Sequence, residues 1–245
     1  MSWRSHGRDN ASLVDALERN GIVKTPEVAR GMRLCDRGCF VSAERDAGSP
    51  SYSDTPLDIG FNVTISAPHM HGYCLELLAA HLGPGMAALD VGSGSGYLTA
   101  VMAAMLAGSS ADGAWRAVGI EHIPELAETS RRNIQGWLRT APKDGDGVVD
   151  RIRQSDALEI REGDAFVGCP GEAFDAIHVG AAAPRLPQNL VEQLKPGGRM
   201  VIPIGTASQD LVVVDKDDRG HLTLKKVMGV RYVPLTSREK QLGSR

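Results

Sequence analysis

The chain has 245 residues, which suits one large α/β domain, and its 4% aromatic content leaves aliphatic residues and methionine to build the core. A net charge of −3, with no Lys/Arg cluster longer than a pair, argues against a nucleic-acid partner. No apolar run reaches the roughly 18 residues of a membrane span, and no secretory signal is visible, so we expect a cytoplasmic protein that does not enter the membrane.

Two helices and a loop are predicted for the first part of the chain. An apolar stripe over residues 13–17 ends at Gly21, a glycine suited to the position after a helix. Residues 25–27, Thr-Pro-Glu, combine an N-cap residue, a helix-starting proline and a first-turn acid, so a second helix should continue to Leu34. Residues 46–60 are rich in turn-forming residues and predict an ordered loop.

Strands and helices alternate through the middle of the chain, and the last strands are joined by a short turn. Repeated βα units predict a Rossmann-like, doubly wound and mostly parallel sheet. The tail predicts an antiparallel hairpin, and residues 139–150 predict a surface insertion. We expect helices over residues 68–82, 97–107, 124–138 and 190–194, and strands over residues 87–91, 117–120, 158–161, 174–179, 200–204, 211–215 and 222–234.

This pattern predicts a single domain over residues 1–245. Residues 1–62 would form an N-terminal helical and loop cap, residues 63–205 the core, and residues 206–245 the C-terminal hairpin and tail.

Residues 89–97, Leu-Asp-Val-Gly-Ser-Gly-Ser-Gly-Tyr, are typical of a strand that runs through a glycine turn into a helix. Glycines let the backbone turn sharply and let a ligand lie against it, although a plain tight turn remains an alternative. The dinucleotide fingerprint needs its third glycine one position later, where Tyr97 stands, which disfavours an NAD-dependent dehydrogenase.

Two acids follow the next strands along the chain. Glu121 comes directly after the second predicted strand, where a carboxylate can accept both hydroxyls of a ribose. Asp164 follows the third strand, at the edge of the sheet where an adenine amino group would lie. A solvated acid at a strand end is the alternative for Glu121.

Residues 64–71, Thr-Ile-Ser-Ala-Pro-His-Met-His, place a hydroxyl, a helix-starting proline and two imidazoles together. Ser66 could serve as a helix N-cap before Pro68. His69 and His71 could ligate a metal, but no third ligand is placed to join them, so no metal site is predicted. His178 is expected to be a core histidine with satisfied hydrogen bonds.

The four cysteines are scattered along the chain, and no second close pair completes a zinc site, so we expect free thiols.

The glycine turn with Glu121 and Asp164 resembles the class I S-adenosylmethionine-dependent methyltransferases, whose sheet carries a late antiparallel strand. The resemblance implies S-adenosyl-L-methionine as cofactor and S-adenosyl-L-homocysteine as product. The Asn/Asp-Pro-Pro-aromatic run of amino methyltransferases is missing after the fourth strand, at residues 175–184, so methylation of nucleic-acid amino groups is a minor alternative.

Nearly the whole chain closely resembles the protein-L-isoaspartate (D-aspartate) O-methyltransferase family, and its eukaryotic branch in particular. The segments that carry this resemblance are residues 64–71, 89–97, 175–184, 194–204 and 232–241. It implies a monomeric repair enzyme that methylates the free α-carboxylate of L-isoaspartyl, and possibly D-aspartyl, residues in damaged proteins and peptides. The ester then closes to a succinimide that can reopen to aspartate.

The resemblance also implies roles for individual residues. Ser66 would bind the substrate carboxylate as the catalytic residue. Because a carboxylate with a pKa of about 4 is already ionised at neutral pH, no strong general base is needed. The expected cofactor-binding residues are Val63, Thr64, Ile65, Ser66, His71, Asp90, Gly92, Ser93, Gly94, Glu121, Asp164, Ala165, Thr236 and Gln241.

Two positions depart from the family pattern. The eukaryotic members usually have Asp where this chain has Glu121, and the family mostly has Gly where it has Ala165. Residues 53–66 and 179–185 are expected to form the peptide cleft. A cofactor-binding adaptor without activity is the alternative from another class, and retention of the complete 64–71 segment argues against it.

Overall fold

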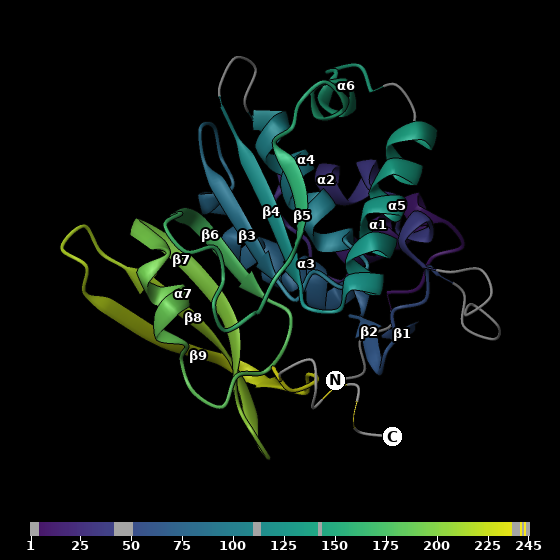
Figure 1. Cartoon of the computed structure of the whole chain (residues 1–245). Helices are drawn as coiled ribbons and strands as arrows, with labels where there is room; N and C mark the ends of the chain where they lie inside the picture. The colour runs from purple at the N-terminus through teal and green to yellow at the C-terminus, as the bar shows by residue number, and fades with distance from the viewer. Residues whose placement is uncertain are drawn as a thin grey trace.

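The computed structural model describes residues 5–41, 51–109, 114–141, 144–236, 241 and 243. At its centre is a seven-stranded sheet with the strand order β5-β4-β3-β6-β7-β8-β9 (Figure 1). The strands are β3 (Ala87–Val91), β4 (Arg116–Glu121), β5 (Leu158–Glu162), β6 (Phe174–Val179), β7 (Leu194–Gly205), β8 (Gln209–Lys216) and β9 (Leu222–Val230).

Neighbouring strands from β5 to β7 run parallel, and β8 and β9 extend one edge of the sheet in antiparallel fashion. The predicted fold class, a mostly parallel α/β sheet with a C-terminal antiparallel hairpin, is confirmed. The chain moves outward from β3 to β5 and returns at β6 on the other side of β3. Ligands of such sheets bind at this reversal, beyond the C-terminal ends of the strands.

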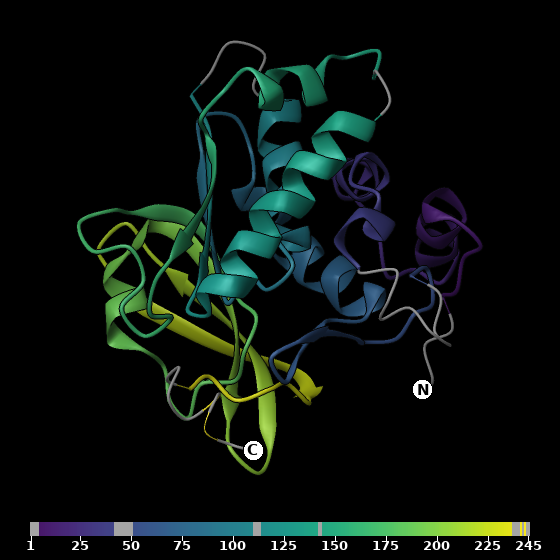
Figure 2. The same cartoon turned by 45° about the vertical axis from the view of Figure 1, so that its right-hand side comes forward.

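Helices cover both faces of the sheet (Figures 1 and 2). Residues of α1 to α6 share one apolar cluster, whereas α7 contributes to a second cluster on the other face. The helices are α1 (Asn10–Arg19), α2 (Pro26–Leu34), α3 (Pro68–Leu78), α4 (Tyr97–Ser109), α5 (Pro124–Thr140), α6 (Val148–Arg153) and α7 (Gln188–Glu192), with 3₁₀ turns η1 (Arg37–Phe40) and η2 (Ala79–His81).

The two apolar clusters follow from the alternation of side chains along the strands. Ala88 and Ala117 point into the cluster that contains α4, whereas their neighbours Leu89 and Val118 point into the cluster that contains α7. Small residues on the α4 side let this helix lie close to the sheet.

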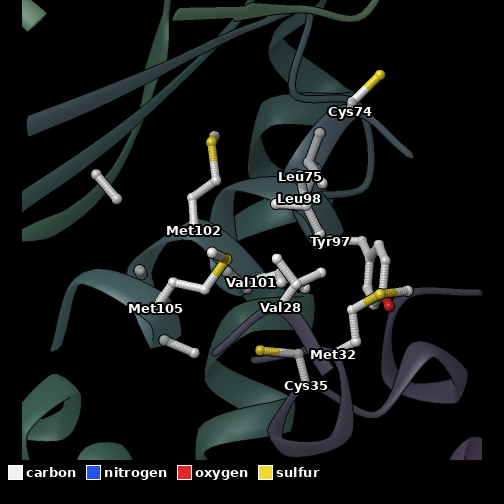
Figure 3. Packing of buried hydrophobic residues seen from close by; sticks show 14 of the residues in the cluster. Val28, Met32, Cys35, Cys74, Leu75, Tyr97, Leu98, Val101, Met102 and Met105 are labelled. Carbon is white, nitrogen blue, oxygen red and sulfur yellow. The ribbon is translucent and has the colours of Figure 1, made fainter. Parts of the chain in front are cut away.

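Helix α4 is the most deeply buried helix, because every residue from Tyr97 to Ala107 is buried. Val28 and Met32 of α2 pack on its outer side, as Figure 3 shows. Gly31 permits this close approach, since a Cβ at that position would lie only 2.9 Å from Cγ of Met105.

A partly buried glutamate of α3 holds the start of α2 in place. Glu76 of α3 accepts hydrogen bonds of 2.8 Å from the backbone N–H groups of Lys24 and Thr25 and from the Thr25 hydroxyl. Thr25 is the N-cap of α2, as predicted, but its side chain binds Glu76 instead of the helix.

Several predicted boundaries are wrong for physical reasons that involve distant partners. Leu57–Gly60 forms strand β1, because it pairs with β2 (Val63–Ile65), and only residues 51–56 of the predicted loop remain irregular among those described. The predicted surface insertion over residues 139–150 includes the start of α6, which packs on α4. Leu194 begins β7 rather than ending a helix, and β9 stops at Val230.

No helix among the described residues is long and apolar enough to cross a membrane. The four cysteines are present as free thiols.

The close packing of the glycine turn against α5 can be tested at Gly96. Gly96 has φ +86°, and a Cβ there would lie 2.3 Å from Oγ of Ser130. Gly96→Ala should lower the free energy of unfolding by about 3 kcal/mol, because backbone strain and overpacking add. Gly220→Ala is the matched control: its φ is +84° with no atom near the new Cβ, so it should cost only about 1 kcal/mol. Equal losses in urea unfolding would contradict the packing argument.

Candidate functional site

Three hollows meet at the C-terminal ends of β3, β4 and β6. They are an open groove of about 640 Å³, an outer cavity of about 60 Å³ and an inner cavity of about 40 Å³. Thr64 and Gly180 line all three, and Ser66 lines the groove and the inner cavity. The junction of the hollows therefore lies at these residues, at the reversal of strand order.

The glycine turn after β3 forms the floor between the two cavities. Gly92, Gly94 and Gly96 have φ values of +76°, +54° and +86°, a region that residues with a side chain rarely adopt. The N–H groups of Gly92 and Ser93 both donate to the carbonyl of Ile120 at 2.9 Å. The turn is thus fixed to β4, and its glycines are required by conformation.

A buried ion pair lines the inner cavity. Oδ1 of Asp90 is 2.8 Å from Nδ1 of His178, and Oδ2 accepts a 2.6 Å hydrogen bond from the Thr99 hydroxyl. Burial alone would lower the pKa of His178, but the interactions with Asp90 and with the Cys74 side chain together outweigh it and raise this pKa to about 10. His178 is therefore a charged core residue, with its hydrogen-bonding capacity used by Asp90 as predicted.

Two buried polar atoms on residues that line the inner cavity have no hydrogen-bond partner. They are Nδ1 of His71 and Oγ of Ser93. Burial, together with the nearby charge of Arg37, lowers the pKa of His71 well below its ordinary value, so the ring is neutral. Unpartnered buried polar atoms are rare in folded proteins and indicate a place where a polar ligand binds.

Glu121 lines the outer cavity from the end of β4. Its carboxylate accepts hydrogen bonds of 3.1 Å from the backbone N–H groups of Gly94 and Ile123. Burial raises its pKa, whereas these N–H groups favour the ionised form. Two backbone donors leave the carboxylate with free lone pairs, which can accept hydroxyl groups.

The far side of the outer cavity is closed by the C-terminal tail. Gln241 lines this cavity, and its side chain joins His122 at 2.7 Å to the carbonyl of Phe61 at 3.1 Å. This bridge connects the end of β4 with the β1–β2 turn.

The groove has one wall from the first turn of α3 and another from the end of β9. Ser66 and His69 contribute to the first wall, and residues 228–233 form the second. Nδ1 of His69 lies 2.8 Å from Oδ1 of the buried Asp54, which also accepts from the backbone of Ser5. Burial opposes the charge of Asp54, but the hydrogen bonds from His69 and Ser5 lower its pKa.

The structure brings together almost all the residues expected at the cofactor site. Asp164 is the exception: it is exposed, lines neither cavity, and its Oδ1 accepts from the backbone N–H of Phe166 at 2.8 Å. The residues that line the outer or inner cavity are Val63, Thr64, Ile65, Ser66, His71, Asp90, Gly92, Ser93, Gly94, Glu121, Ala165, Thr236 and Gln241.

Other predictions for this region need correction. Ser66 is not the N-cap of α3, because Ala67 occupies that position and no side chain caps the helix. Of residues 179–185, only Gly180 lines the groove, and the wall formed by residues 228–233 was not predicted. Among the described residues, no group of three or more His, Cys, Asp or Glu side chains is arranged to hold a metal ion.

The fold and the arrangement of the three hollows define a class I methyltransferase. A model of the family Protein-L-isoaspartate(D-aspartate) O-methyltransferase matches residues 8–240. Protein-L-isoaspartate O-methyltransferase 1 of Arabidopsis thaliana is 49% identical over 95% of this chain and 94% of its own length. The corresponding enzyme of Triticum aestivum is 51% identical over the same shares.

A solved structure agrees with these relatives. A crystal structure from Plasmodium falciparum, assigned as a protein-L-isoaspartate O-methyltransferase in complex with S-adenosyl-L-homocysteine, has a TM-score of 0.80 and 33% identity. The match covers 95% of this chain and 100% of that one. The chain therefore belongs to the protein-L-isoaspartate(D-aspartate) O-methyltransferase family.

The contribution of the buried Asp90–His178 pair to stability can be tested by varying the pH. Asn at position 178 could still donate to Asp90 but would carry no charge, so His178→Asn should lower the free energy of unfolding by about 2 kcal/mol. The folded-state pKa of His178 is raised to about 10. The stabilisation is therefore complete below the ordinary histidine pKa of about 6.5 and is lost as the pH rises towards 10.

Urea unfolding of both proteins between these pH values measures the difference. A difference that stays constant over the whole range would show that His178 acts through packing rather than through its charge.

Proposed function

We propose that the protein moves a methyl group from S-adenosyl-L-methionine to the free α-carboxylate of L-isoaspartyl residues in damaged proteins and peptides. The observation that carries this proposal is the position of Ser66, which lines both the open groove and the inner cavity. A hydroxyl at this junction can hold a peptide carboxylate where the groove meets a cofactor. Family membership supplies the reaction type.

The two cavities fit the proposed cofactor. Unpartnered polar atoms of His71 and Ser93 suit the amino acid part, and the glycine turn leaves the backbone open to it. Glu121 suits the ribose hydroxyls, and the buried Ala165 suits the apolar face of the adenine. When bound, S-adenosyl-L-methionine supplies an activated methyl group on a sulfonium. Asp164 stays a predicted adenine contact that would require a change in its turn.

The residues of this chain contribute position rather than acid–base chemistry. The substrate carboxylate is ionised at neutral pH, so no side chain has to remove a proton. The Ser66 hydroxyl donates a hydrogen bond that orients the carboxylate towards the inner cavity. Holding two reactants in line can supply several kcal/mol of the barrier.

The neutral state of His71 also suits this reaction. The inner cavity is already lined by the compensated pair of Asp90 and His178. A neutral His71 adds no positive charge that would repel a bound sulfonium. The Arg37 charge that helps to keep this ring neutral is itself fully buried.

We further infer that the chain acts as a single-domain, cytoplasmic monomer without a nucleic-acid or membrane partner. Ser5 is joined through Asp54 to His69 of the groove, and Gln241 lines the outer cavity, which supports a single domain. The net charge of −3 supports the absence of a nucleic-acid partner, and the four free thiols support a cytoplasmic location. The family description also names D-aspartate, so we propose D-aspartyl residues as a second substrate.

Labelled methyl transfer to paired peptides tests the proposed function. The peptides share one sequence and differ only in an isoaspartyl or an aspartyl link. Label from S-adenosyl-L-methionine should enter the isoaspartyl peptide alone, because only this link leaves a free α-carboxylate on a main chain lengthened by one methylene. Equal labelling, or none with correctly folded protein, would reject the repair activity.

Substitutions at Ser66 and Glu121 should separate catalysis from cofactor binding. Ser66→Ala should lower kcat about 100-fold, the usual effect of removing one positioned donor, with little change in cofactor affinity. Glu121→Gln should raise the Kd for S-adenosyl-L-homocysteine about tenfold, because the cavity loses a charged acceptor.

Steady-state kinetics and calorimetric titration measure the two effects. If cofactor affinity collapses in Ser66→Ala as well, Ser66 is a structural residue rather than a substrate-binding one.

A further inference from the structure

The groove contains a single formally charged side chain. Its described lining is apolar or neutral apart from His69 and Arg231, and no Asp or Glu lines it. The lining residues are Pro56, Thr64, Ser66, Ala67, His69, Met70, Gly180, Met228, Gly229, Val230, Arg231, Tyr232 and Val233.

The imidazole of His69 is paired with a carboxylate, whereas the guanidinium of Arg231 has no acidic partner among the described residues. Nδ1 of His69 lies 2.8 Å from the buried carboxylate of Asp54. The exposed Arg231 forms no ion pair with a described residue, although Lys226 of β9 forms a 2.6 Å pair with Asp210. The uncompensated positive charge of the groove is therefore that of Arg231.

The backbone that carries Arg231 is firmly held. Gln209 of β8 accepts from the Tyr232 N–H at 2.6 Å and donates to the Tyr232 carbonyl at 3.1 Å. Two residues later, Pro234 forms a bridge with Ala182. The guanidinium is flexible, but its starting point is fixed at the groove wall, which limits the entropy lost when it pairs with a ligand.

The groove is larger than one residue needs. Its volume of about 640 Å³ falls in the range of sites that bind ligands of several residues' size. Residues that flank the isoaspartyl link must therefore lie along the same walls as Arg231. A carboxylate among them would find a cation that has no acidic partner in the part of the chain that the structure describes.

We propose that Arg231 is a specificity-determining residue that makes the enzyme favour isoaspartyl sites flanked by an acidic residue. The inference rests on the proposed function and adds a substrate class to it. The overall charge of −3 works against acidic substrates, so such a preference has to come from a local cation.

Three isoaspartyl peptides that carry Glu, Gln or Lys next to the modified residue, on either side, test the proposal. The wild-type protein should show the highest kcat/KM with Glu and the lowest with Lys, with about threefold between successive peptides, the size expected of one partly exposed ion pair. The difference should lie in KM and shrink in high salt. Arg231→Met should abolish the order, Arg231→Lys should largely retain it, and Arg231→Glu should reverse it.

Lys225→Met is the matched control, since it removes one exposed positive charge from β9 outside the groove. It should leave the order of the peptides unchanged. Equal loss of preference in Lys225→Met and Arg231→Met, or a wild-type protein indifferent to the flanking residue, would overturn the proposal. So would a uniform rise in KM for all peptides in Arg231→Met, which would place the guanidinium on the isoaspartyl carboxylate itself.

The two proposals fail in different ways. Without methylation of the Gln peptide by the wild-type protein, the proposed function fails. Peptide Kd values in the presence of S-adenosyl-L-homocysteine then still test the charge preference, and equal Kd values for Glu and Lys peptides would reject it.

Discussion

The carboxylate of Asp90 joins three elements at the point where the strand order reverses. Asp90 lies near the end of β3, one oxygen accepts from Thr99 on α4, and the other binds His178 on β6. A buried carboxylate without these partners would cost several kcal/mol, so the positions of β3, α4 and β6 are tied to one another. The glycine turn begins two residues later and takes its position from this joint. Both cofactor cavities therefore depend on it.

The groove and cavities are completed by contacts between segments far apart in the sequence. Asp54 ties the first turn of α3 to Ser5 near the N-terminus, and Gln209 fixes the backbone at Tyr232. Gln241 reaches Phe61 across 180 positions of the chain. A cavity built this way forms only when both ends of the chain have folded onto the sheet.

Local patterns in the sequence were sufficient to predict the parts of the site that depend on backbone geometry. The positions of Gly92 to Gly96 follow from a strand, a turn and a helix in succession, and Glu121 follows from the end of the next strand. The pairing of Asp90 with His178 was not predicted, although parallel β3 and β6 place the two residues side by side in register. The pairing follows from β3 and β6 being neighbours in the sheet, and neither residue by itself indicates this strand order.

The same reason explains why the second groove wall was missed and Ser66 was partly misjudged. Residues 228–233 line the groove because β9 is the last strand added at the sheet edge, which no local pattern reveals. Ser66 resembles an N-cap because Pro68 follows closely, but the helix starts with Ala67 as its cap, and the hydroxyl is left to face the hollows. A resemblance to a family supplies the proposed role of Ser66, which propensity alone does not indicate.

The distribution of charge separates two tasks within one site. In the lining of the inner cavity, the charge of Asp90 is compensated by His178, and His71 is neutral. The reacting groups therefore meet little net electric field from the side chains around them. At the groove the balance differs, because Asp54 is hydrogen-bonded to His69 while Arg231 has no counterion among the described residues. Since the charge at the groove wall does not enter the inner cavity, substrate preference can change at Arg231 without disturbing the geometry that aligns the reaction.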